Sequence, residues 1–111
     1  MKAKPFKFNG KDLYEPCEPK EATHLSIRLP CGCYALMLPV MIGGTRAGTL
    51  NWTWNGDTEK PTVRPSVLTR GHNFTCHSWI NDGVMQFLTD TQGHEHEGFG
   101  GTSKPLLEIE K

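Results

Sequence analysis

The sequence predicts a mainly β fold, a small antiparallel β-sandwich or rolled sheet with long loops, pinned by a zinc knuckle. Short segments alternate apolar and polar residues with the period of two that is typical of half-buried strands. The 12 glycines and 8 prolines among 111 residues indicate many turns and short elements. No segment has a helical period longer than a turn or two.

The chain is expected to divide into an N-terminal arm, residues 1–22, and a single β domain, residues 23–111. The arm is rich in Lys, Glu and Pro and carries only scattered apolar residues. One domain is also what a chain of this length most often forms.

The first strand is expected in "HLSIRLP", residues 24–30, where every second residue is apolar. A second strand is expected over residues 34–38 and ends at Pro39, because proline cannot donate a hydrogen bond to a neighbouring strand. Residues 41–49 contain three glycines and are expected to form a loop.

The second half of the chain carries four further strand signals. "LNWTW" (50–54) places apolar residues on one face, and "PTVRPSVLT" (61–69) is β-like, although its prolines confine it to an edge or a bulge. "TCHSWI" (75–80) and "VMQFL" (84–88) flank an Asp-Gly pair, which predicts a hairpin. The alternating tail, residues 105–111, predicts the last strand.

Charge and hydropathy exclude several classes of function. Twelve basic residues balance twelve acidic ones, which argues against general nucleic-acid binding. Trp52, Trp54 and Trp79 could stack on bases, but alternating tryptophans in a strand are more often core residues. No window approaches the roughly 20 apolar residues of a membrane span, and the N-terminus lacks an apolar signal region. We therefore expect a cytoplasmic protein.

The chain contains four cysteines, which are Cys17, Cys31, Cys33 and Cys76. In a reducing cytoplasm such cysteines are more often metal-binding or catalytic than disulfide-bonded. Buried thiols that only pack in the core are the alternative. Cys17, in "EPCEP", is interpreted as an exposed bystander.

A C-x-C pair, a later Cys-His pair and the histidines of "HEHE" together supply enough ligands for zinc, which prefers four thiolates and imidazoles in a tetrahedron. Adjacent Cys76 and His77 would face opposite sides of a regular strand, so they could share a metal only if the chain bends. The sequence leaves open whether His77 or His94 is the fourth ligand.

The succession "LPCGC", "WTWNGDTEKPTVRPSV", "CHSWINDGVMQFLTD" and "HEHEG" resembles a family of small phage and bacterial proteins, over residues 29–98. Members occur in phage genomes and beside bacterial ubiquitin-like conjugation genes. The resemblance implies a bound zinc (Zn²⁺) but no activity. The ligands that it implies are Cys31, Cys33, Cys76 and His77. His94 matches the family's late histidine, although this chain has one more residue between Asp90 and that histidine.

Our main functional prediction is a zinc-stabilised β module that acts by binding another macromolecule, with a protein as the expected partner. If the chain is phage-borne, such a module would be an inhibitor of a host defence or a host enzyme, acting in the host cytoplasm. Arg46, Arg64 and Arg70 are the candidate surface contacts.

The alternative prediction is a metal-dependent hydrolase. Here His94 or His96 joins the cysteines, and Glu95 or Glu97 acts as the general base on a metal-bound water. The two predictions differ in coordination, because a structural site is closed by four protein ligands and a catalytic one keeps an open position.

Overall fold

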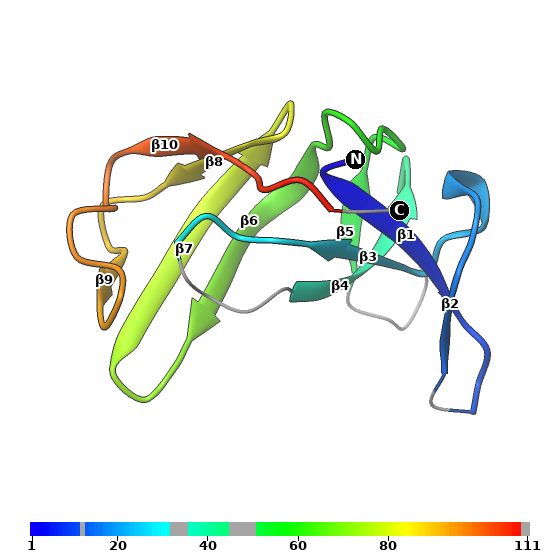
Figure 1. The fold of residues 1–111 in the computed structure, drawn as a ribbon, viewed down its shortest axis with the longest axis horizontal. Coiled ribbons are helices and arrows are strands. Elements are labelled where there is room, and N and C mark those ends of the chain that lie inside the picture. Colours follow the sequence, from blue (N-terminus) through cyan, green and yellow to red (C-terminus); the bar gives the residue numbers. More distant parts are fainter. Residues whose placement is uncertain (12, 32–35, 45–50, 110–111) are drawn as a thin grey trace.

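The computed structural model describes residues 1–11, 13–31, 36–44 and 51–109, and it confirms the mainly β fold (Figure 1). Among these residues there is no α-helix, only the single-turn 3₁₀-helix η1 (Pro19–Glu21). Consistent with this, no helix of the described chain is long and apolar enough to span a bilayer.

The described residues contain ten strands, which form one sheet. In chain order they are β1 (Ala3–Phe8), β2 (Tyr14–Pro16), β3 (His24–Ile27), β4 (Leu36–Ile42), β5 (Trp52–Trp54), β6 (Val63–Arg70), β7 (Phe74–Asn81), β8 (Val84–Phe87), β9 (Gln92–Gly93) and β10 (Ser103–Pro105). Across the sheet the order is β10-β8-β7-β6-β5-β4-β3-β1-β2, and β9 pairs with β7. The named pairs are antiparallel except β4–β5, which is parallel.

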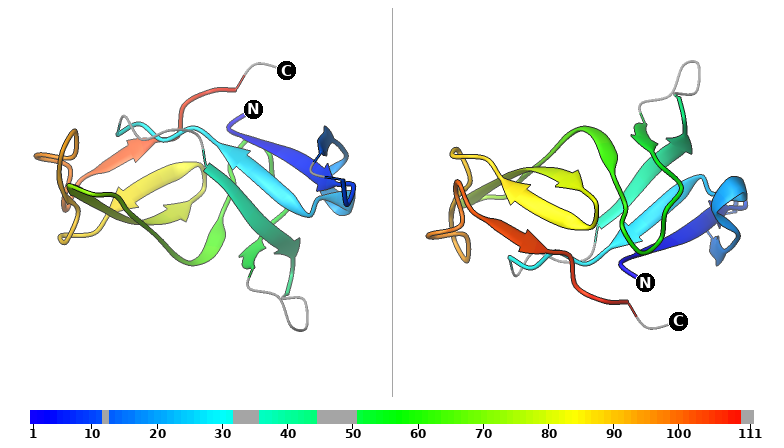
Figure 2. Two further views of the ribbon diagram at one scale, coloured as in Figure 1. Left: turned by 90° about the horizontal axis from the view of Figure 1, so that it is seen from below. Right: turned by 90° about the horizontal axis from the view of Figure 1, so that it is seen from above.

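The C-terminal tail returns from β10 toward the first strands of the sheet (Figures 1 and 2). Leu107 forms a bridge with Arg28, just beyond β3, and the amide of Ile109 donates a 2.7 Å hydrogen bond to the carbonyl of Met1. The expected terminal strand over residues 105–111 is not formed in its described part: β10 ends at Pro105, and residues 106–109 contribute an isolated bridge at Leu107 and no strand.

The hydrophobic core is built from alternate, inward-facing residues of the strands. Its largest fully buried apolar side chains are Trp54, Leu25, Ile27, Ile80 and Met85. Trp54 is only 1% exposed, so it serves the core and cannot stack on a nucleic acid base.

Two features of the first half differ in detail from expectation. The predicted arm, residues 1–22, contributes β1 and β2 to the sheet, and β1 pairs with β3. Pro39 does not end the second strand: β4 continues to Ile42 and changes its ladder partner from β3 to β5 after Pro39. Proline cannot donate a hydrogen bond to a ladder. It is tolerated at Pro39 because pairing with β3 ends at this residue and pairing with β5 begins at Val40.

A β-bulge interrupts β6, as its prolines predict. The register against β7 shifts between Val63 and Val67, and Pro65 and Ser66 lie within the shift. Since β6 is paired on both sides, by β5 and β7, the bulge and not an edge position accommodates the proline. The predicted hairpin between β7 and β8 is also present, with Asp82 and Gly83 both at positive φ, as a two-residue turn requires.

Candidate active site and metal centre

The central strand β7 presents two chemically different faces. Cys76, Ser78 and Ile80 point into the core and are at most 2% exposed, whereas His77 and Trp79 lie on the other face and are only half-buried. This alternation is the ordinary period of a β-strand. Each face carries its own cluster of reactive side chains.

On the outer face, Ser66, His77 and Asp90 form a hydrogen-bonded chain. His77 Nε2 lies 2.9 Å from the hydroxyl oxygen of Ser66, and His77 Nδ1 lies 3.0 Å and 3.2 Å from the two carboxylate oxygens of Asp90. A carboxylate accepts the Nδ1 proton, which leaves Nε2 to accept the serine proton. This is the arrangement of a Ser-His-Asp catalytic triad, which is recognised by geometry and not by chain order.

Three different elements position these side chains. The bulge in β6 turns Ser66 toward β7, and bulges commonly re-aim side chains beside active sites. His77 lies in the regular part of β7, where it is paired with Leu68 of β6. Asp90 lies in the connection that follows β8. The side chains of His77 and Asp90 are 24% and 55% exposed, so a substrate can reach them.

Arg64 and Trp79 extend the outer face beside the triad. The Arg64 guanidinium stacks over the Trp79 ring at 5.5 Å, and its Nη1 donates a 2.8 Å hydrogen bond to the carbonyl of Val63. Arg64, a candidate surface contact in the sequence, is thus held two residues from Ser66. Arg46, another candidate, lies outside the described residues, and Arg70 is exposed at the end of β6.

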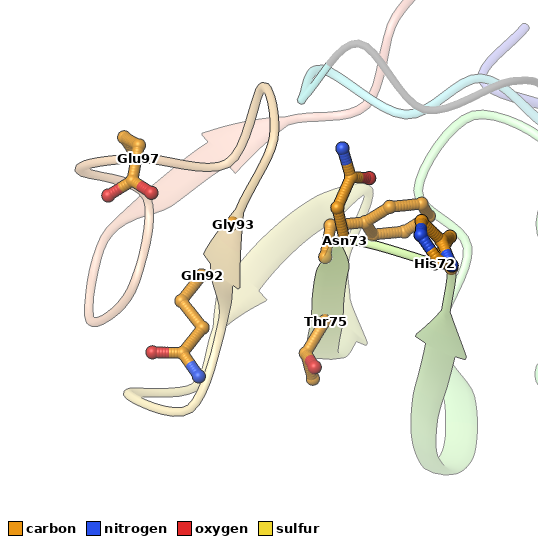
Figure 3. A pocket seen from close by; sticks show the side chains of 8 residues that line it. His72, Asn73, Thr75, Gln92, Gly93 and Glu97 are labelled. Atoms are coloured by element: carbon orange, nitrogen blue, oxygen red, sulfur yellow. The ribbon is translucent and has the colours of Figure 1, made fainter.

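A polar pocket of about 390 Å³ lies between the β6–β7 hairpin and β9 (Figure 3). Its lining includes His72, Asn73, Thr75, Gln92 and Glu97. Thr75 precedes His77 by two residues on β7 and is paired with Gln92, which follows Asp90 by two residues. The pocket therefore lies one step along β7 from the triad, on the same face.

On the inner face, Cys31, Cys76 and His96 form a buried cluster. Their potential ligand atoms all lie within 4.8 Å of one another, and each residue is about 2% exposed. These three residues are close enough to bind a metal ion. Cys76 lies on β7, Cys31 lies in the segment after β3, and His96 lies in the loop after β9.

The distance between the two sulfur atoms is compatible with a shared metal ion. The two sulfur atoms are 3.8 Å apart, and two thiolates bound tetrahedrally at about 2.3 Å would also lie about 3.8 Å apart. A disulfide would need a sulfur–sulfur distance of about 2.0 Å.

His96 is oriented as metal-binding histidines usually are. Its Nδ1 lies 2.6 Å from the carbonyl oxygen of His94, so the Nδ1 proton is donated to the backbone and the lone pair remains on Nε2. The ring also stacks on Phe74, with centroids 4.8 Å apart and planes inclined by 6°. Both contacts hold the imidazole in one orientation.

The predicted metal ligands are therefore divided between several places. Cys31 and Cys76 come together, whereas His77 lies on the opposite face of β7, where Ser66 and Asp90 occupy both ring nitrogens. The strand does not bend at Cys76, so the neighbouring side chains cannot share a metal. The histidine of the cluster is His96.

His94 is exposed, and its Nε2 lies 3.8 Å from the carboxylate of its neighbour Glu95. Glu95 and Glu97, the general bases of the hydrolase prediction, are also exposed, whereas the cysteine cluster is buried. The prediction for Cys33 lies outside the described residues.

Ser66 and Asp90 are the site residues that the sequence interpretation missed. Ser66 follows a Pro-rich stretch without the G-x-S-x-G pattern of a nucleophile elbow. The available signal was the alternation of "TCHSWI", which places His77 on the outer face and away from Cys76. An outward-facing histidine needs partners other than the cysteines.

Comparison with known proteins identifies a family for this chain. The model of the family described as "Bacterial ubiquitination-like system serine protease (BubE)" matches residues 2–88, which include Ser66 and His77, and Asp90 lies two residues beyond the match. No curated protein and no solved structure matches the chain.

This match corrects the main functional prediction. A family of serine proteases is incompatible with a non-enzymatic binding module, so that prediction was wrong, together with its form as an inhibitor of a host defence. The alternative prediction of a hydrolase agrees better with the family.

Proposed function

The chain belongs to the BubE family of serine proteases of bacterial ubiquitination-like systems, and on that premise we propose that it is a serine protease whose catalytic residues are Ser66, His77 and Asp90. The observation that carries the proposal is the continuous hydrogen-bonded chain of these three side chains, with 2.9 Å and 3.0 Å links on the two sides of the imidazole. The family indicates the class of reaction, and this geometry supplies a nucleophile, a base and an orienting carboxylate.

In the first half of the reaction, the Ser66 hydroxyl oxygen attacks the carbonyl carbon of the scissile amide while His77 Nε2 takes the hydroxyl proton. The carbon–nitrogen bond breaks as His77 returns this proton to the leaving amine, and an acyl ester remains on Ser66. In the second half, His77 takes a proton from a water molecule, whose oxygen attacks the ester carbonyl; the bond to Ser66 breaks as His77 returns that proton to the serine oxygen, which releases a carboxylic acid and restores the serine.

Asp90 acts on the histidine and not on the substrate. Its carboxylate accepts the Nδ1 proton, which keeps the ring in the tautomer that presents Nε2 to Ser66. It also stabilises the imidazolium that forms when the serine proton is transferred.

We propose that the substrate is a polypeptide of a bacterial ubiquitination-like system, in line with the family's description. The outer face suits a polypeptide, because the triad lies on an accessible sheet surface with a polar pocket on one side and the Arg64–Trp79 stack on the other. Such a surface can contact residues on both sides of a scissile bond.

The inner cluster has a different proposed role, that of a structural zinc site. Cys31, Cys76 and His96 would hold the ion, and Cys33, two positions from Cys31 in the sequence, would be the fourth ligand. With Cys33 as the fourth ligand, the site would have no open position for water, as structural zinc sites require. The ion would supply coordination bonds that join three chain segments, and the hydrolytic steps would involve only the outer face.

The proposed activity is tested by incubating the purified chain with a proteome-derived peptide library and identifying cleaved bonds by mass spectrometry. Ser66→Ala should abolish cleavage. Ser78→Ala is a matched control, because Ser78 faces the core and its hydroxyl has no hydrogen-bond partner among the described residues. Retained cleavage in Ser66→Ala would contradict the proposal, and loss in both variants would point to a folding defect that circular dichroism can detect.

A further inference from the structure

One edge of β7 has a gap in its ladder at His77. β8 pairs with residues 78–81 and β9 pairs with residues 74–75, so neither strand is paired with His77. The Thr91 hydroxyl occupies this gap: it accepts the His77 amide proton at 3.1 Å and donates its own proton to the His77 carbonyl at 2.9 Å. The amide of Leu88 also donates a 2.8 Å hydrogen bond to the His77 carbonyl, so the Thr91 hydroxyl is the acceptor for the His77 amide and a second donor to its carbonyl.

Thr91 directly follows Asp90 in the chain. The carboxylate of Asp90 holds the ring of His77, and the hydroxyl of Thr91 holds its backbone. Thr91 is only 5% exposed, and its own amide donates a 3.0 Å hydrogen bond to the carbonyl of Leu88. The segment that carries Asp90 is therefore hydrogen-bonded to the backbone of His77, whose ring Asp90 orients.

We propose that Thr91 is a positioning residue of the proposed serine protease. Its hydroxyl sets the distance between the backbone of His77 and the Asp90 segment, and so it aims Nε2 at Ser66. This inference rests on the proposed function, since it assigns Thr91 a role in the reaction and not only in folding. Displacement of a catalytic group by about 1 Å can reduce the rate by a factor on the order of 10².

Another threonine provides a matched control. The Thr62 hydroxyl accepts the amide proton of Asp82 at 2.9 Å and so joins two chain segments at the β7–β8 turn. Thr62→Val removes a comparable hydroxyl–backbone hydrogen bond outside the triad. A purely structural role for Thr91 would give Thr91→Val the same phenotype as Thr62→Val.

The test compares Thr91→Val, Thr91→Ser and Thr62→Val in steady-state hydrolysis of a peptide that the wild-type chain cleaves. We expect Thr91→Val to lower kcat by roughly 10- to 100-fold with little change in KM. Thr91→Ser should restore most of the rate because it keeps the hydroxyl, and Thr62→Val should retain wild-type kinetics. Equal kcat in Thr91→Val and Thr62→Val would overturn the inference, as would a serine variant as impaired as the valine.

A second measurement on the wild-type chain does not depend on the folding of any variant. Hydrogen exchange followed by NMR should show a protected His77 amide, although no strand pairs with it on that edge. Exchange as fast as that of an unprotected amide would overturn the inference. Ser66→Ala separates the two proposals. If this variant remains active, the triad itself is wrong. If Ser66→Ala is inactive and Thr91→Val is fully active, only the role of Thr91 is excluded.

Discussion

The two faces of β7 use neighbouring residues for unlike chemistry. Cys76 faces the core, where the other cysteine and an imidazole are within reach of one ion. His77, the next residue, faces outward and contacts a hydroxyl and a carboxylate, with its side chain 24% exposed. Burial removes water and favours a closed metal site, whereas partial exposure leaves room for a substrate. One peptide bond thus separates a proposed structural centre from a proposed catalytic one.

Because Cys76 and His77 are consecutive residues, the metal cluster and the triad are connected through the backbone. The inner cluster holds Cys76 and His96, and between these positions in the sequence lie both His77 and Asp90. We therefore expect loss of the metal to disturb the triad, whereas changes in the triad should leave the metal in place.

Removal of the metal should have the largest effect. Cys76→Ser should abolish zinc binding and destabilise the fold by an amount on the order of ten kcal/mol, since a structural zinc contributes about this much to small domains. Native mass spectrometry and thermal unfolding would measure the two quantities. Cys17→Ser is the control, because Cys17 lies outside the cluster; burial raises the pKa of its thiol, which disfavours the metal-binding thiolate.

An unchanged melting temperature after complete chelation would remove the structural role of the cluster. It would also break the expected asymmetry, because the triad would then be independent of the inner face.

Loss of the base should have the next largest effect. His77→Ala should reduce kcat by roughly 10⁶-fold, and combining it with Ser66→Ala should cost no more, because nucleophile and base act as one unit. Zinc content should remain that of the wild-type chain. A double variant much slower than either single variant would show that the two residues act independently.

Replacing the orienting carboxylate should cost less. Asp90→Asn should lower kcat by at most about 10⁴-fold, the loss that follows when the histidine is held in the wrong tautomer. Circular dichroism and zinc content should be unchanged. Activity equal to that of the wild-type chain would exclude Asp90 from the triad.

The smallest expected effect concerns the aromatic support of the metal site. Phe74→Leu removes the stacking partner of the His96 ring, and aromatic pairs contribute about 0.5–1.5 kcal/mol beyond their buried area. We expect a stability loss of this size in urea unfolding, with kcat unchanged. Phe8→Leu, at a ring 36% exposed, is the comparison. A large loss of activity in Phe74→Leu would mean that the two faces are more tightly joined than their separate contacts suggest.

The fold was largely predictable because strand signals are local. Alternation located β3, β5, β6, β7 and β8, and the Asp-Gly pair located the β7–β8 hairpin. The change of partner within β4 was not predictable, since it depends on which distant strands approach Pro39.

The site was only partly predictable, for the same reason. Cys31 and Cys76 were recognised by residue type, but no local pattern distinguishes His96 from His94. The orientation of His96 arises from its stacking on Phe74 and its hydrogen bond to the backbone. Ser66 has no sequence signal of its own, because its approach to His77 depends on a bulge that becomes visible only when β6 is paired with β7.

The most direct test of the central claim, that Ser66 is the nucleophile, is covalent labelling. The folded wild-type chain is treated with a fluorophosphonate, and the adduct is located by intact-mass and peptide-mapping mass spectrometry. We predict a single adduct on Ser66 that is absent from Ser66→Ala and forms far more slowly in His77→Ala. An unlabelled Ser66 in the folded, zinc-loaded chain, or the same adduct in Ser66→Ala, would contradict the account.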